Sequence, residues 1–151
     1  MIPSGCSLCK CSSRRSDRKF AANSRKGSRV QAEPVIAIID DDESMRNAVV
    51  ALVRSSGYNA RGFASAEEFL GCGAVASSAC VITDIQMPQM SGIELKRHLA
   101  ACHCPVPVIM FTARHDPGVE ESALASGAAF FLRKPFEAHT LISCLESALK
   151  P

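Results

Sequence analysis

Five short apolar runs separated by helical patterns dominate the chain from residue 34 onwards. The runs are Val35–Ile39, Tyr58–Phe63, Cys80–Thr83, Val108–Phe111 and Ala128–Leu132. Each has the length of a strand, and the stretch that follows it carries apolar residues at helical spacing. Strict alternation of strands and helices is typical of a parallel sheet with right-handed crossovers and helices on both faces. The sequence therefore predicts an α/β fold with a doubly wound parallel sheet.

Turn and capping residues set the expected bounds of the helices. The first helix is expected to end at Gly57, and the second to start with a capping box of Ser65 and Glu68. The fourth is expected to follow Asp116-Pro117, since proline suits the first turn of a helix, and to end at Gly127. The apolar faces of the first, third and last helices are expected at Met45, Val49, Leu52 and Val53, at Leu95 and Leu99, and at Leu141, Ile142, Leu145, Ala148 and Leu149.

Charge divides the chain into two parts. Residues 1–33 hold eight Lys and Arg against two acids, whereas the rest holds nine basic and thirteen acidic residues. The first part is rich in Ser, Arg and Lys and lacks apolar periodicity, so we expect a disordered basic tail, 1–33, before one domain, 34–150. Alternatives for the tail are an anion-binding segment, a transit peptide or an upstream extension of the gene model.

Neither membrane insertion nor secretion is expected. The chain has no apolar run near the roughly 18 residues that span a bilayer, and no signal-peptide pattern at its start. We expect a cytoplasmic protein whose eight cysteines are reduced. Cys72, Cys80 and Cys144 are interpreted as small buried hydrophobes. A structural metal at Cys6, Cys9 and Cys11 or at Cys102-His103-Cys104 is a minor alternative.

The segment Val81–Gly92, VITDIQMPQMSG, contains the main candidate for chemistry. Asp84 is the first charged residue after a buried strand, so its side chain is expected at the carboxyl edge of the sheet, where such sheets bind ligands. Met87-Pro88 delays the next helix until Gly92. Taken alone, Asp84 is more simply a helix cap or a solvated loop acid.

Polar groups also follow three other predicted strands. Asp40-Asp41-Asp42-Glu43 follows the first, Thr112-Ala113 the fourth, and Lys134-Pro135 the fifth. With Asp84 they make a four-part pattern that resembles the response-regulator receiver domain of the chemotaxis and nitrogen-fixation-regulator type, from about Pro34 to Leu149. The resemblance implies a flavodoxin-like (βα)5 fold with strand order 2-1-3-4-5, which brings Asp40, Asp41 and Asp84 into one crevice.

The resemblance also implies the roles of the site residues. Crowded carboxylates need a cation, and Mg²⁺ suits oxygen ligands that leave room for water and phosphate. Asp41 and Asp84 would bind it directly, Asp40 through water, and Gln86 through its backbone carbonyl. Asp84 would then be the phosphoacceptor. Its helpers would be Lys134, which pairs with the phosphoryl oxygens, and Thr112 and Ala113, which supply a hydroxyl and space for a backbone amide. The Lys134–Pro135 peptide is often cis in this family.

The leading hypothesis for function is a stand-alone receiver rather than an enzyme. The phosphoryl donor would be a sensor histidine kinase or a histidine phosphotransfer protein. Thr112 and Phe131 would move the face made by the helix after Pro117, the strand Ala128–Leu132 and the last helix. That face would bind a downstream effector or a second copy in a phosphorylation-dependent homodimer; the domain itself is expected to contact neither nucleic acid nor membrane.

Two alternatives remain. One is a transcriptional regulator that lacks its DNA-binding domain. The other is an aspartyl-phosphate hydrolase of the haloacid-dehalogenase type, which needs an acid where this chain has Gln86.

Overall fold

The computed structural model describes residues 34–114 and 116–150, so the predicted tail 1–33 lies outside the described residues. The elements in chain order are β1 (Val35–Ile39), α2 (Glu43–Ser55), β2 (Asn59–Phe63), α3 (Ala66–Gly71), the 3₁₀ turn η3 (Ala74–Ser77), β3 (Ser78–Asp84), α4 (Gly92–Ala101), β4 (Val108–Thr112), α5 (Val119–Ala125), β5 (Phe130–Arg133) and α6 (Ala138–Leu149). The predicted alternation of strands and helices is confirmed.

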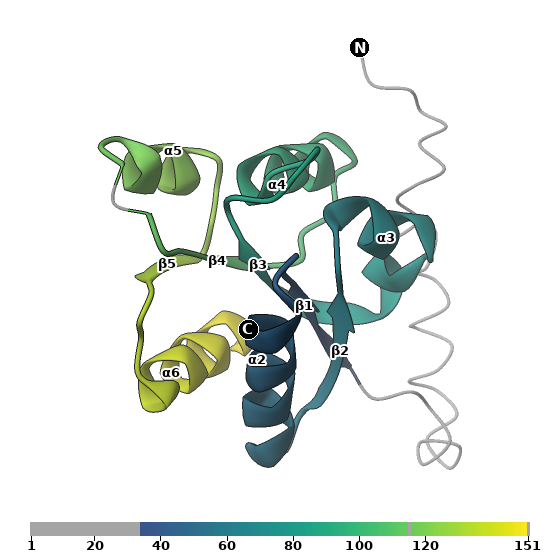
Figure 1. The fold of residues 1–151 in the computed structure, drawn as a ribbon. Helices are drawn as coiled ribbons and strands as arrows, with labels where there is room; N and C mark the ends of the chain where they lie inside the picture. Colours follow the sequence, from purple (N-terminus) through teal and green to yellow (C-terminus); the bar gives the residue numbers. More distant parts are fainter. Residues whose placement is uncertain (1–33, 115, 151) are drawn as a thin grey trace.

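The strands form one parallel sheet in the order β2-β1-β3-β4-β5. This is the order that the resemblance implied. Figure 1 shows α2 and α6 on one face of the sheet and α3, α4 and α5 on the other. The neighbours β1 and β3 connect to helices on opposite faces, so the crevice between their carboxyl ends is the switch point at which such sheets bind ligands.

Side-chain alternation along the central strands divides the core into two layers. In β1, Ile36 and Ile38 pack with α2 and α6, whereas Ala37 and Ile39 pack with α3, α4 and α5. All four are essentially inaccessible to solvent. A strand that is apolar on both faces belongs in the middle of such a sandwich. The carboxyl end of β1 is therefore held rigidly from both sides.

The helix starts differ in detail from the predictions. Ser65 caps α3 by accepting from the backbone N–H of Glu68, but the Glu68 carboxylate accepts from Ala64 at 2.9 Å, so half of the predicted box forms. The complete capping box lies at α4, between Ser91 and Glu94. It was not predicted, because the sequence SGIE resembles the end of the preceding loop as much as a helix start.

The start of α5 was also predicted too early. The helix begins at Val119 behind Gly118, whose φ of 84° is left-handed, and no side chain caps it. A left-handed residue interrupts the helical backbone, so Asp116-Pro117 belongs to a turn rather than to the first turn of α5. The predicted ends are correct, because Gly57 and Gly127 have positive φ angles just after α2 and α5.

The cysteine interpretations are partly confirmed. Cys80 is buried, which raises the pKa of its thiol to about 12, and Cys144 is half-buried. Cys72 is exposed, contrary to the prediction, because it lies just past the end of α3. Within residues 34–114 and 116–150, Cys102, His103 and Cys104 are not gathered into a metal-ligand group. Cys6, Cys9 and Cys11 lie outside the described residues.

No helix in the described part of the chain combines the length and the apolar character that crossing a membrane requires.

Candidate functional site

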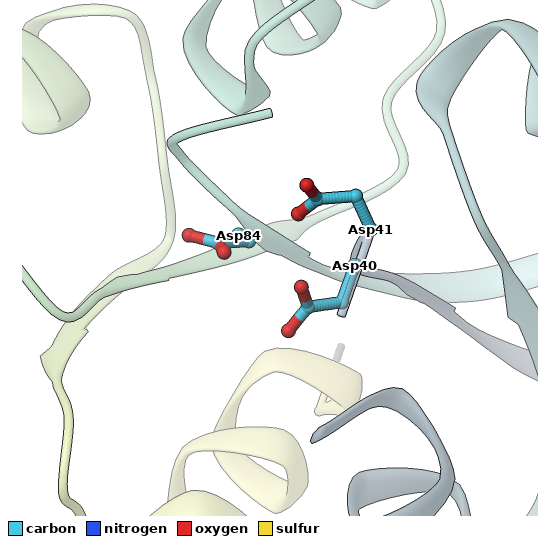
Figure 2. A group of neighbouring side chains, drawn as sticks. All are labelled: Asp40, Asp41 and Asp84. Carbon is cyan, nitrogen blue, oxygen red and sulfur yellow. The ribbon is translucent and has the colours of Figure 1, made fainter. Parts of the chain in front are cut away.

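Three carboxylates meet where β1 and β3 end. Asp40 follows β1 directly, Asp84 is the last residue of β3, and the register Ile39↔Thr83 puts them on adjacent strands. Asp41 comes next along the chain, and one carboxylate oxygen from each of the three lies within 4.8 Å of the others. Figure 2 shows the three side chains together at the ends of β1 and β3, with the carboxylates of Asp40 and Asp41 on the side of Asp84. We call Asp40, Asp41 and Asp84 the acid cluster.

Asp40 is the most constrained member of the acid cluster. Its backbone N–H donates to Phe63 at 3.1 Å, and its carbonyl accepts from the Arg46 guanidinium at 2.8 Å. Its side chain is fully buried and accepts from the backbone N–H of Asp42 at 3.0 Å. Burial raises the pKa of the Asp40 carboxyl, while the Asp42 hydrogen bond and Lys134 oppose the shift. These bonds orient the carboxylate towards the cluster.

Asp84 is almost as enclosed, and it faces a cation. One carboxylate oxygen accepts from the backbone N–H of Gln86 at 3.2 Å, and the other lies 3.6 Å from Lys134 Nζ. Burial raises the pKa of Asp84 to about 6; Lys134 lowers it and the neighbouring carboxylate of Asp40 raises it. Asp84 therefore has a carboxylate that is only partly neutralised by its surroundings.

Lys134 follows the edge strand β5, and its side chain reaches Asp40 and Asp84. Its backbone N–H donates to the carbonyl of Thr112 at 2.8 Å, which ties the end of β5 to the end of β4. Its Nζ lies 3.5 Å from Asp40 Oδ2, 3.6 Å from Asp84 Oδ2 and 4.7 Å from the centre of the Phe111 ring. The following peptide, Lys134–Pro135, is cis, as the resemblance implied.

Thr112 is the last residue of β4 and is completely buried. Its hydroxyl donates to the side-chain oxygen of Gln86 and accepts from the backbone N–H of Arg114 at 3.1 Å. Ala113 follows as an exposed residue at the strand end. Lys134 thus lies beside Asp84. Thr112 contacts the side chain of Gln86, whose backbone N–H donates to the Asp84 carboxylate. The bond between Thr112 and Gln86 was not predicted.

Phe131 lies on the face of β5 that packs with α3, α4 and α5. It is half-buried, pairs in register with Met110 of β4, and has the Arg133 guanidinium 5.5 Å from its ring centre. Thr112 is two residues beyond Met110, so its side chain is on this same face of the sheet. Phe130 packs on the opposite face, with α2 and α6. The strand register therefore makes Phe131 the aromatic residue on the Thr112 side.

Gly92 is a site residue whose role the sequence did not reveal. A Cβ at this position would lie 2.6 Å from the backbone oxygen of Asp84 and 3.2 Å from Ile85 Cα. The Gly92 N–H also donates to the Ile85 carbonyl at 3.1 Å. The start of α4 is thus in direct contact with the end of β3. The glycine was visible in the sequence, but the contact that requires it joins residues brought together by the folded loop.

The composition of the cluster matches a hard divalent cation. All its side-chain donors are carboxylate oxygens, from two buried residues and one exposed residue, and the ammonium of Lys134 lies within 3.6 Å of two of these carboxylates. Mg²⁺ prefers a few carboxylates with water in its remaining positions, and the exposed Asp41 leaves one side of the cluster open. The residues present therefore fit Mg²⁺.

Comparison with known proteins agrees with this geometry. Residues 36–146 match the response regulator receiver domain family. The chain is 36% identical over 118 residues to the response regulator protein TmoT of Ectopseudomonas mendocina, covering 78% of this chain and 54% of TmoT. It is 36% identical over 115 residues to the transcriptional regulatory protein FixJ of Bradyrhizobium diazoefficiens, covering 76% of this chain and 56% of FixJ. The matched part thus spans about half the length of these relatives.

Solved structures of similar fold include two that this chain matches over nearly their whole length. The crystal structure of FixJ-N matches with a TM-score of 0.72 at 31% identity, covering 79% of this chain and 95% of that one. The chemotaxis protein CheY4 of Vibrio cholerae matches with a TM-score of 0.69 at 28% identity, covering 78% of this chain and 100% of that one.

Proposed function

The chain belongs to the response regulator receiver domain family of two-component systems, and we propose that it is a phosphorylation switch with Asp84 as its phosphoacceptor. The observation that carries the proposal is the placement of Lys134 Nζ within 3.6 Å of two carboxylates from neighbouring strands. An acceptor carboxylate with a cation beside it can receive a dianionic group, because phosphoryl transfer depends mainly on positioning and charge stabilisation.

The transfer would exchange one bond for another. A carboxylate oxygen of Asp84 attacks the phosphorus of a phosphohistidine, a P–O bond forms, and the P–N bond breaks. The electron pair returns to the imidazole nitrogen of the donor, which takes a proton from solvent. Lys134 balances the charge that arrives on the phosphoryl oxygens, and Thr112 and the backbone beside Ala113 supply donors to them. The donor would be a sensor histidine kinase or a histidine phosphotransfer protein.

The acid cluster would hold Mg²⁺ during this step. Asp41 and Asp84 would bind the ion directly, Asp40 through water, and Gln86 through its backbone carbonyl. The ion would supply charge neutralisation to the cluster and to the phosphoryl oxygens. The crowding of three carboxylate oxygens within 4.8 Å supports this assignment, because such a group is strongly self-repelling without a cation.

Output is proposed to occur through α5, β5 and α6, which correspond to the fourth helix, fifth strand and fifth helix of the (βα)5 unit. Phe131 and Thr112 lie on the face of the sheet that α3, α4 and α5 cover, and the half-buried Val119 of α5 packs against the same core layer as Phe131. A movement of Thr112 towards a phosphoryl group would therefore open space near this aromatic ring. The partner would be a cytoplasmic effector protein or a second copy of the chain.

A second candidate is favoured by the relatives. FixJ is named a transcriptional regulatory protein, and this chain covers 56% of its length. The domain would then regulate a DNA-binding unit rather than act as a stand-alone receiver. A gel-shift assay compares DNA binding by the full chain and by a chain that lacks residues 1–33. Binding that is lost with these residues would show that the tail contacts DNA directly. A hydrolase function is disfavoured, since Gln86 occupies the position where an acid would be required.

The acceptor is tested by incubation with acetyl phosphate and Mg²⁺, followed by mass spectrometry of the intact protein. We expect one added phosphoryl group on the wild-type chain and none on Asp84→Asn. The matched control is Asp116→Asn, an exposed acid outside the cluster, which should react like wild type. A full equivalent on Asp84→Asn would refute the assignment.

The switch is tested by amide chemical shifts with and without beryllofluoride, a stable phosphoryl mimic. We expect changes around Phe131 and α5 as well as around Asp84, because a shift of only a few kcal/mol between two states is needed. Changes limited to the loops around Asp84 would contradict the proposed output face while leaving the acceptor assignment intact.

A further inference from the structure

The hydroxyl of Thr112 has one proton, which it donates in a hydrogen bond to the side chain of Gln86. Thr112 is completely buried, and its Oγ1 donates to Gln86 Oε1. The same oxygen accepts from the backbone N–H of Arg114 at 3.1 Å. A hydroxyl has one donor, so this proton cannot serve Gln86 and a phosphoryl oxygen at the same time.

Gln86 also contacts the proposed acceptor. Its backbone N–H donates to Asp84 Oδ1 at 3.2 Å, so the residue joins the end of β3 to the end of β4. Its side chain is half-buried in the loop between β3 and α4. Gln86 is therefore bonded at both strand ends, through its backbone N–H to Asp84 and through its side-chain oxygen to Thr112.

We propose that the Gln86 side chain is a positioning residue that competes with the phosphoryl group for the hydroxyl proton of Thr112. The inference rests on the proposed function of Asp84, and it identifies the Gln86 side chain as the group that opposes the movement of Thr112. With Gln86 as the acceptor, Thr112 is stabilised in the position it holds in the unphosphorylated chain. Phosphorylation must break this hydrogen bond before Thr112 can donate to the new group.

Removal of the amide should have two linked effects. A buried hydroxyl without an acceptor is costly, but this cost falls only on the unphosphorylated state, because a phosphoryl oxygen replaces Gln86 in the other. The unliganded protein should therefore be less stable, whereas its affinity for a phosphoryl mimic should increase. Linkage requires that a ligand gains affinity when the competing state is destabilised.

The test compares Gln86→Met and Gln86→Ala, which lack the acceptor and differ in volume. Beryllofluoride with Mg²⁺ is the probe, and its dissociation constant is measured by calorimetry. We expect both variants to bind it on the order of tenfold more tightly than wild type, with a lower melting temperature before binding. Gln89→Met is the matched control, since Gln89 is an exposed glutamine in the same loop and should leave the affinity unchanged.

A double-mutant cycle with Thr112→Val isolates the bond. Valine keeps the shape of the side chain and lacks the hydroxyl, so Gln86→Met should no longer raise the affinity in that background. Equal affinities of wild type, Gln86→Met and Gln86→Ala would overturn the proposal, as would a gain that survives in Thr112→Val. Failure of the wild-type chain to bind the probe at all would instead contradict the proposed function.

Discussion

At the scale of single residues, the surroundings of Asp84 shift the pKa of its carboxyl group away from the ordinary value for aspartate. Its carboxyl group is enclosed at the sheet edge, and burial raises its pKa to about 6 from the ordinary 3.8, with Lys134 opposing the shift. The folded chain therefore binds this proton more tightly than the unfolded chain. The resulting stabilisation is complete below about pH 4 and is lost as the pH rises through 6.

Because the stabilisation is lost as the pH rises, the effect of Asp84→Asn in the absence of Mg²⁺ should depend on pH. The variant has no ionisable group at this position, and its side-chain oxygen can still accept from the N–H of Gln86. Near pH 4 its free energy of unfolding should be close to that of wild type, and at pH 7.5 it should be higher by about 1–3 kcal/mol. Urea denaturation at the two pH values measures the difference.

Glu146→Gln is the control for that experiment, because Glu146 is an exposed carboxyl on α6. Its substitution should change the free energy of unfolding by no more than about 0.5 kcal/mol at either pH. A difference between Asp84→Asn and wild type that is the same at pH 4 and pH 7.5 would show that the charge of Asp84 does not destabilise the fold. Added Mg²⁺ should narrow the gap at pH 7.5, since it would stabilise the wild-type carboxylate.

At the scale of elements, the loop between β3 and α4 brings the start of α4 into contact with the end of β3. The capping box of Ser91 and Glu94 starts α4 immediately beside the end of β3. Gly92 then lies against the backbone of Asp84 and Ile85, where a side chain has no room. The sequence predicted a helix at this glycine, but not that the backbones of the helix and the strand touch.

Gly92→Ala should therefore displace the acceptor loop. Its Cβ would meet the Asp84 carbonyl oxygen at 2.6 Å, and a backbone atom cannot rotate away as a flexible side chain can. We expect a loss of about 1–3 kcal/mol in the free energy of unfolding, together with weaker binding of beryllofluoride. Thermal and urea denaturation measure the first effect, and calorimetry the second.

Gly71→Ala is the matched substitution, because Gly71 ends α3 and its added Cβ would have no neighbour within 4 Å. It should be neutral or stabilise the chain by up to about 1 kcal/mol through a less flexible unfolded state. If Gly92→Ala proved as harmless as Gly71→Ala, the contact between α4 and the end of β3 would be looser than its distances indicate.

At the scale of the whole molecule, residues 34–114 and 116–150 form two core layers, one on each face of the sheet. Their buried residues extend from Ile36 to Leu145, and the partly buried residues around them end at Leu149. The acid cluster, Thr112 and Lys134 lie at the carboxyl ends of β1, β3, β4 and β5. Folding of this sheet therefore assembles the acid cluster, Thr112 and Lys134 together.

Deletion of residues 1–33 should accordingly leave the domain intact. The tail lacks a periodic apolar face that could pack on the sheet or its helices. We expect the melting temperature of residues 34–151 to stay within about 2 °C of the full chain, which corresponds to less than about 1 kcal/mol at this size. A larger decrease in differential scanning calorimetry would show that the tail contributes to the fold.

Local patterns in the sequence were enough to predict the element types and the residues at strand ends. Apolar period, glycine and proline are local properties, so the five strands, most helix ends, and Asp40, Asp84, Thr112 and Lys134 could be found from neighbouring residues alone. The order of the strands could not be derived in this way, because their hydrogen bonds join segments far apart in the chain. That order came from the resemblance, and the sheet confirms it.

The contacts that connect the site residues depend on the folded structure. The raised pKa of Asp84 depends on burial, the contact of Gly92 depends on the path of a folded loop, and the bond between Thr112 and Gln86 crosses from β4 to the loop after β3. The position of Lys134 between Asp40 and Asp84 joins residues 94 and 50 positions apart. None of these is a property of a short stretch of sequence, because solvent exclusion and contact exist only once the sheet has formed.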